Sequence, residues 1–251
     1  MTAQTARSTT TRLRMWRGRA ASHSLALALT LAISAGSSVA QAAEVGHHSP
    51  MAWRASGQNG GVMTMYEGAY RMEMLPLTGK APTAAELAYA SRLAAVAARF
   101  GDRYPTTAAA RAAGFRTYGV LDVPGQGAHY FDPLASIAAD MGGFDANRPP
   151  FLVFKGTRLA GIMYFMPVGT SPARLNQLVP RSLAPWHRHV DVCVVGGART
   201  GRVVAAYTPA ACAARNGRFY PSTGWMAHVW LGQPVGPGLF TMDQPGTPGG
   251  M

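Results

Sequence analysis

Two histidines at alternate positions of one apolar segment are the residues of this chain best suited to chemistry. His187 and His189 lie in the segment WHRHVDVC, whose period of two predicts a β-strand. Because side chains two residues apart point to the same face of a strand, both imidazoles would share a face with Asp191 and Cys193. Imidazole nitrogens are common ligands of transition metals, and a carboxylate beside them can fix the tautomer of a ligating ring. The segment therefore predicts a metal site in which Asp191 is the partner of an imidazole.

Two further histidines stand in apolar segments with the pattern of regular structure. His228 lies in the strand-like segment WMAHVW, and His129 lies in GAHYF, at an expected loop-to-strand junction. Three or four imidazoles gathered in one place suit zinc, copper, nickel or non-haem iron. We predict His187, His189 and His228 as ligands of copper or zinc, with His129 as a fourth. A coordination position left open would let the metal activate water or oxygen, so the sequence leaves undecided whether the protein is an enzyme.

Methionines early in the chain point to copper. Thioether sulfur is a soft ligand that selects Cu(I). The chain between residues 47 and 74 holds two histidines and five methionines: His47, His48, Met51, Met63, Met65, Met72 and Met74. The alternative is that these methionines only fill space in a core, as flexible apolar side chains commonly do.

A second hypothesis needs no metal. Aromatic walls with a few polar groups are typical of pockets for small organic ligands. Five aromatic residues stand near the histidines in the sequence and would line such a pocket: Trp186, Trp225, Trp230, Tyr130 and Tyr164. In this interpretation the histidines supply the polar groups. A purely structural role is a third alternative, but it leaves the histidine pattern unexplained.

The first 43 residues have the three parts of a secretory signal peptide. Five arginines among the first twenty residues precede an apolar stretch at 25–35, and small residues at 40–43 provide a cleavage site. That stretch is shorter than the roughly 20 residues that span a bilayer. We therefore expect residues 1–43 to be removed and the remaining chain to be periplasmic or secreted, with no membrane span. The alternative is that the segment stays as an uncleaved anchor.

The expected export decides how the two cysteines are interpreted. Cys193 and Cys212 are the only cysteines in the sequence. In an oxidising compartment they predict one disulfide that closes a loop of about twenty residues. A metal thiolate or two free thiols are the alternatives.

The formal charge of +12 does not indicate a nucleic-acid partner. Five of the 23 Lys and Arg residues lie in the expected signal peptide, and the others are scattered without a basic run or helix face. Motifs for nucleotide binding, serine hydrolysis and HExxH metalloproteases are absent. The 11 acidic residues are dispersed and give no carboxylate pair of a glycosidase. The partners that remain are a metal ion or a small molecule.

The elements that must position these residues predict a single α+β domain over 81–242. The capping box from Thr83 to Glu86 opens a helix that runs to about Arg99, and a second short helix follows between Pro105 and Gly114. Alternating apolar segments then predict a mostly antiparallel sheet. Its strands are expected at 151–154, 159–166, 186–195, 203–207 and 225–231, with a short helix around Cys212.

The segments on either side of this domain lack a regular apolar period. Residues 44–80 are predicted to be a flexible Met- and Gly-rich lead-in, in which 62–75 has the pattern of a hairpin. Residues 243–251 are predicted to be a disordered tail.

The order of the motifs resembles a family of exported bacterial proteins with the pattern HY…GxMY…WHxHxxxC…WMxHxW. The pattern is carried here by His129-Tyr130, Gly161-Ile-Met-Tyr164, Trp186-His-Arg-His189 with Cys193, and Trp225-Met-Ala-His228-Val-Trp230. The resemblance covers about residues 105–242. It implies one compact domain whose histidines matter, and it implies no reaction.

The H-x-H pattern is also similar to the first motif of the cupin barrel. In this chain the acid, Asp191, follows His189 by two residues, whereas a cupin has a glutamate several residues later. The helix expected around Cys212 departs from the cupin pattern as well. A cupin-like barrel is therefore the minor alternative for the fold.

Overall fold

The structure is a computed structural model that describes residues 54–59, 61–67, 70–123, 125–196, 202–205 and 208–245. Contacts divide the chain into residues 1–46 and 47–251, and all described residues belong to the second unit. The expected signal peptide and the last six residues of the expected tail lie outside the described residues.

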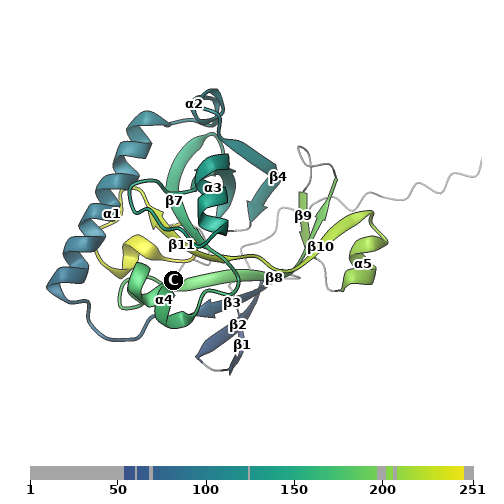
Figure 1. The fold of residues 1–251 in the computed structure, drawn as a ribbon, viewed down its shortest axis with the longest axis horizontal. Helices are drawn as coiled ribbons and strands as arrows, with labels where there is room; N and C mark the ends of the chain where they lie inside the picture. The colour runs from purple at the N-terminus through teal and green to yellow at the C-terminus, as the bar shows by residue number, and fades with distance from the viewer. Residues whose placement is uncertain are drawn as a thin grey trace, which may run out of the picture. The chain divides into compact units, whose positions relative to one another are not determined.

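The strands of the described residues form one mostly antiparallel sheet (Figure 1). Hydrogen-bonded neighbours follow the order β1-β2-β3-β8-β11-β7-β6-β5-β4-β9, and β10 pairs with β8. One parallel residue pair joins β4 to β9, and β9 also pairs with β8. The strands are β1 (Arg54–Asn59), β2 (Val62–Glu67), β3 (Tyr70–Leu75), β4 (Arg116–Val123), β5 (Gly127–Phe131), β6 (Phe151–Lys155), β7 (Arg158–Met166), β8 (Trp186–Val195), β9 (Arg202–Ala205), β10 (Gly217–Ser222) and β11 (Trp225–Trp230).

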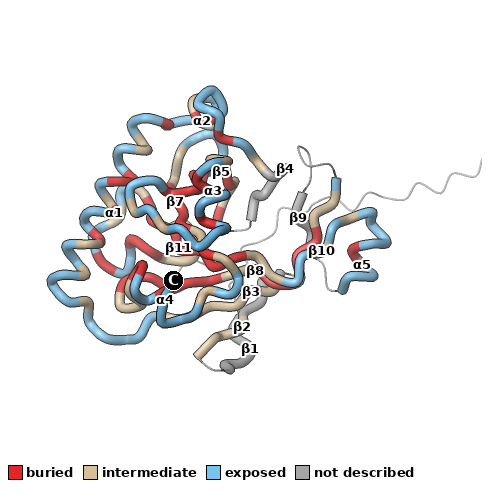
Figure 2. Tube along the Cα trace, viewed as in Figure 1, coloured by how far each residue is buried: buried red, intermediate tan, exposed pale blue. Residues whose placement is uncertain are grey.

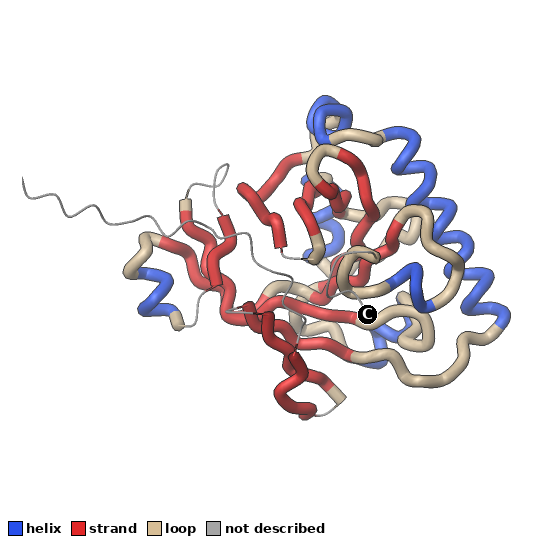
Figure 3. Tube along the Cα trace, turned by 180° about the vertical axis from the view of Figure 1, so that it is seen from behind, coloured by secondary structure: helices blue, strands red, loops and turns tan. Residues whose placement is uncertain are grey.

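Five α-helices and one 3₁₀-helix complete the described residues, so the α+β class is confirmed. They are α1 (Ala84–Arg103), α2 (Thr107–Ala112), α3 (Pro133–Asp140), α4 (Pro172–Leu178), α5 (Pro209–Ala213) and η1 (Pro237–Phe240). The expected capping box is present at the start of α1, where the hydroxyl of Thr83 accepts from the backbone N–H of Glu86 at 3.2 Å. Helix α1 packs on β7 and β11, and Figure 3 shows it running along the outer side of the strands.

The two faces of the sheet contain different side chains because neighbouring residues of a strand point in opposite directions. Leu93 and Val96 of α1 share the main hydrophobic core with Ile162 and Trp186 of the sheet. Trp230 belongs to a smaller, separate cluster on the opposite face, with Val153, Met163 and Met226. Figure 2 shows that buried residues concentrate in β7, β8 and β11. These strands therefore offer a second buried face that the helices do not cover.

The structure differs from the expected lead-in at residues 44–80. Strands β1, β2 and β3 lie within this segment, and β2 and β3 form the expected hairpin. Among the described residues of this segment, β3 is held by pairing with β8 over five residues, from Arg71 opposite Val190 to Leu75 opposite Trp186. Three strands therefore precede the helices that were expected to open the domain.

The beginning of the predicted tail is also anchored. Asp243 is 4% exposed, and the backbone N–H of Gln244 donates to the carbonyl of Gly125 at 2.9 Å. The chain is therefore held by backbone contacts for at least two residues beyond 242.

Gly161 makes room for the ring of Trp230 on the face opposite to the helices. A Cβ atom at this position would lie 2.8 Å from Cε3 of Trp230 and 2.7 Å from the carbonyl oxygen of Val229. The ring cannot move away freely, because its Nε1–H donates to the carbonyl of Thr241 at 2.7 Å. The glycine of the GxMY motif is therefore explained by packing.

We expect Gly161→Ala to lower the free energy of unfolding by about 1–3 kcal/mol, the usual cost of overpacking a buried site. Denaturant unfolding followed by tryptophan fluorescence measures it. Gly169→Ala is the matched control, since a Cβ there meets no atom within 4 Å, and it should change stability by less than about 0.5 kcal/mol. Equal effects of the two substitutions would contradict this explanation.

Candidate metal centre

The structure brings the four predicted histidines together on the face of the sheet opposite to the helices. His129 lies on β5, His187 and His189 on β8, and His228 on β11, and their exposed fractions are 6%, 0%, 7% and 1%. The ring centroids of His187 and His228 are 5.0 Å apart, those of His129 and His228 5.7 Å, and those of His187 and His189 5.8 Å. The four imidazoles form one continuous, buried group, called the imidazole cluster below.

Strand order alone would keep His129 away from His228. Strands β6 and β7 lie between β5 and β11, which amounts to three strand spacings or about 14 Å. Nevertheless, Nε2 of His129 lies 3.4 Å from Nε2 of His228. The sheet must therefore curve around the imidazole cluster so that side chains from non-adjacent strands meet.

Backbone carbonyls fix the orientation of two of the rings. Nδ1 of His129 lies 3.0 Å from the carbonyl oxygen of Gly127, and Nδ1 of His228 lies 2.9 Å from that of Met242. A carbonyl only accepts, so each Nδ1 carries the proton, and in a neutral ring Nε2 then presents its lone pair. Gly127 has φ +78°, a left-handed conformation that favours glycine and that belongs to the turn leading into β5.

The two Nε2 atoms have the separation of two ligands of one metal ion. Zinc–imidazole bonds of about 2.0–2.1 Å at a tetrahedral angle place two nitrogens about 3.3–3.4 Å apart. The observed separation is 3.4 Å. Protonation of both rings at Nδ1 leaves the two Nε2 atoms facing each other, an arrangement that a shared cation stabilises.

His187 is the most unusual member of the cluster. Its side chain is fully buried, and neither Nδ1 nor Nε2 has a hydrogen-bond partner among the described residues. Burial lowers its pKa well below the ordinary value, and the neighbouring imidazoles, His228 first among them, lower it further. A neutral, desolvated imidazole is the form that ligates a metal ion.

His189 and His228 are neutral for the same reason. Burial, with a smaller contribution from His129, lowers the pKa of His189 to about 4. Burial also lowers the pKa of His228 well below its ordinary value, although the hydrogen bond to Met242 opposes the shift. Nε2 of His189 lies 3.3 Å from Oε1 of Gln126, a side chain that is fully buried. If this nitrogen donates, Nδ1 of His189 keeps the lone pair.

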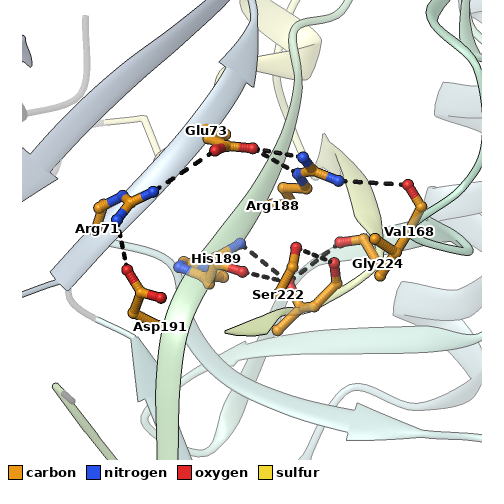
Figure 4. A network of polar contacts seen from close by, with 9 residues as sticks. Arg71, Glu73, Val168, Arg188, His189, Asp191, Ser222 and Gly224 are labelled. Atoms are coloured by element: carbon orange, nitrogen blue, oxygen red, sulfur yellow. Dashed lines mark hydrogen bonds and ion pairs between the residues drawn. The ribbon is translucent and has the colours of Figure 1, made fainter. Parts of the chain in front are cut away.

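Asp191, predicted to orient an imidazole, makes a different contact. Its carboxylate lies 2.6 Å from Nη1 of Arg71, and Figure 4 shows it in a chain of ion pairs that continues through Glu73 to Arg188. The strict alternation of β8 ends here, because Asp191 has φ +55°. The orientation of the rings comes instead from two carbonyls and Gln126.

Cys193 and Cys212 form the predicted disulfide, so neither is a thiolate ligand. Gly217 packs against the disulfide, since a Cβ at this position would collide with Sγ of Cys193.

The aromatic residues of the alternative hypothesis do not form one wall. Four of them, Tyr130, Tyr164, Trp186 and Trp225, belong to the main core, whereas Trp230 lies with the cluster on the other face. Trp230 contacts the imidazole cluster directly, with its ring centroid 4.8 Å from that of His228. The structure therefore supports one aromatic neighbour of the histidines rather than an aromatic pocket.

Among the described residues, no set of three or more His, Cys, Asp and Glu side chains is arranged as a complete metal centre. The part of the chain that the structure describes also has no helix long and apolar enough to cross a membrane. Comparisons of the chain with protein-family models, with curated proteins and with solved structures find no match. The resemblance to an exported family and the similarity to cupins therefore stay predictions.

Sequence reasoning missed Gln126 and Met242, which contact the rings from outside the strands. Gln126 immediately precedes β5, and Met242 follows η1. Neither position belongs to a periodic segment, so hydrophobic patterning gave no signal for them. The only hint was the GAHYF motif, because a glycine two residues before a histidine allows the turned carbonyl that His129 uses.

The metal-free protein is expected to lose stability as the pH falls below about 6.5. The unfolded chain protonates these imidazoles near pH 6.5, whereas burial holds the folded pKa of His189 at about 4 and those of His187 and His228 well below 6.5. The unfolded state binds more protons in this range, so the free energy of unfolding decreases with decreasing pH. His189 alone accounts for about 3 kcal/mol between pH 6.5 and pH 4. Denaturant midpoints that stay constant from pH 7 to pH 5 would contradict this.

Replacing His187 by leucine should leave the metal-free protein equally stable or make it more stable by about 1–2 kcal/mol, because two desolvated nitrogens are removed. His228→Leu is the matched comparison. It leaves the Met242 carbonyl without its donor and should lower the free energy of unfolding by about 1–3 kcal/mol. Thermal unfolding of both variants after chelation measures the difference. A His187→Leu variant as unstable as His228→Leu would mean that His187 is a structural residue.

Proposed function

We propose that the protein binds a transition-metal ion, copper or zinc, between His129, His187 and His228, with His189 as a further ligand. The observation that carries the proposal is His187, whose two ring nitrogens are buried without a hydrogen bond among the described residues, beside His228. Leaving such a group unsatisfied costs about 1–3 kcal/mol. A metal–nitrogen bond offsets that cost and gives the residue a function.

The proposal requires a modest rearrangement of side chains. His129 and His228 are held by carbonyls with their Nε2 atoms 3.4 Å apart, so they supply two ligands with fixed positions. His187 has no hydrogen bond to break, so only the packing of its neighbours opposes a turn of its ring toward the ion. His189 would exchange its contact with Gln126 for the metal.

The disulfide supports an oxidising compartment, and we include the periplasm or the exterior of the cell in the proposal. Binding is proposed without a catalysed reaction, since no described contact identifies a substrate position.

Metal titration tests the proposal. The protein, produced without a histidine tag and stripped by a chelator, is loaded with Zn(II) or, in anaerobic buffer with a reductant, with Cu(I), and then passed through a desalting column. We expect elemental mass spectrometry to find at least one ion of either metal per chain. At 100 times the dissociation constant, one bound ion adds about 2.7 kcal/mol to the stability, a rise of about 5–10 °C in Tm for a domain of this size.

Two variants locate the ion. His187→Leu should lose the Zn(II) and the thermal shift while remaining folded, whereas the double variant His47→Ala/His48→Ala should retain both. A wild-type protein that keeps neither metal would overturn the proposal. In that case a proton shared between the two Nε2 atoms is the remaining explanation of their contact, and it would give a strongly downfield N–H resonance that disappears in His228→Leu.

A further inference from the structure

A small cluster made only of methionines lies beside the histidines. Met72 is fully buried, and Met63, Met74 and Met242 pack against it and are partly buried. We call these four residues the methionine cluster. The other hydrophobic clusters of the described residues that flank the sheet mix aliphatic and aromatic side chains. Three methionines packed around a fourth are therefore a local feature rather than the general composition of the core.

Strand register connects the methionine cluster to the imidazole cluster. Met72 stands directly opposite His189, and Met74 directly opposite His187, in the antiparallel pairing of β3 with β8. Met63 of β2 stands opposite Met74 in turn. Residues directly opposite each other in an antiparallel pair lie side by side on one face. A row of thioethers thus leads from Met63 across β3 to the two histidines of β8.

Met242 connects the two clusters a second time. Its side chain packs against Met72, and its carbonyl accepts the hydrogen bond from Nδ1 of His228. On the other side of the imidazoles, Met226 stands opposite His187 and Met163 opposite His228. Methionines therefore border the histidines along β3, β7 and β11.

The chemistry of these donors selects a particular ion. Thioether sulfur is soft and uncharged, and it favours Cu(I) over Zn(II). The buried imidazoles beside it are also neutral, and bringing a monovalent cation among neutral donors costs less desolvation than bringing a divalent one. Both cysteines are committed to the disulfide, so a thiolate does not compete for the ion.

We propose that the methionine cluster of Met63, Met72, Met74 and Met242 is a second, thioether-based Cu(I) site that adjoins the imidazole cluster. This inference rests on the proposed metal binding for its neighbour, but the site itself is separate. The ion assigned to the protein is then Cu(I), because only a soft monovalent ion would bind to both clusters. Zn(II) would use the imidazoles alone.

The test uses the full protein labelled with ¹³C at the methionine methyl groups. Ag(I), a redox-inert substitute for Cu(I), is titrated in anaerobic buffer, and Zn(II) is titrated in parallel. We expect Ag(I) to shift the methyl resonances of the four cluster methionines, with two ions bound per chain, and Zn(II) to leave those resonances nearly unchanged. Competition with a chromophoric Cu(I) chelator gives the affinity of each site.

Conservative variants separate sulfur chemistry from packing. Met72→Leu/Met74→Leu keeps the apolar volume and should weaken one of the two Cu(I) sites at least tenfold while Zn(II) binding stays the same. Met141→Leu is the control, because Met141 is 79% exposed and outside the cluster, and it should change neither metal.

The outcomes distinguish this site from its neighbour. Methyl shifts that persist in His187→Leu, with Zn(II) binding lost, would support the thioether site independently. Unshifted cluster methyls in a wild-type protein that still binds Zn(II) would overturn the thioether site and leave the imidazole site intact. Equal Cu(I) affinity in the double variant and in the wild type would overturn it as well.

Discussion

The desolvation of four imidazole rings on one face of a curved sheet is the constraint on which the rest of the site depends. Away from water, three of the rings stay neutral, because burial is the largest cause of the lowered pKa values of His187, His189 and His228. In a neutral imidazole one nitrogen donates a hydrogen bond and the other accepts one, so each ring needs two partners. The protein satisfies part of this need with the carbonyls of Gly127 and Met242, and His187 shows that it does not satisfy all of it.

The other face of the sheet compensates for this cost. The main core beneath the helices buries Leu152, Phe154 and Ile162 completely, and full burial of such side chains contributes about 1.5–3 kcal/mol each. Strand β8 contributes to both faces of the sheet, since Trp186 belongs to the main core and His187 belongs to the imidazole cluster. The residues that stabilise the fold and those of the imidazole cluster thus alternate along one strand.

Much of this arrangement could be predicted from the sequence, and what was missed has physical reasons. The period of two in WHRHVDVC fixed the bounds of β8 and the shared face of His187 and His189, because alternation is a local property. The same alternation places Trp186 opposite to His187, which is why the aromatic residues do not surround the histidines. Asp191 was misplaced since its positive φ interrupts the alternation, and no local pattern predicts the long-range contacts of Gln126 and Met242. The pairing of the expected lead-in with β8 could not be predicted, because it joins residues more than 110 apart in the sequence.

The segment after η1 holds residues of the imidazole cluster in place through its backbone. The carbonyls of Thr241 and Met242 hold Trp230 and His228, and the next backbone link runs from Gln244 to Gly125, at the start of the turn that carries Gln126 and Gly127. A few residues near the carboxyl terminus thereby tie β11 to β5. Proteolysis after residue 240 would remove the hydrogen-bond acceptors of both His228 and Trp230 without cutting a strand. The backbone contacts of residues 241–244 therefore control the positions of the His228 and Trp230 rings, and a change in this segment would alter the imidazole cluster without replacing any histidine.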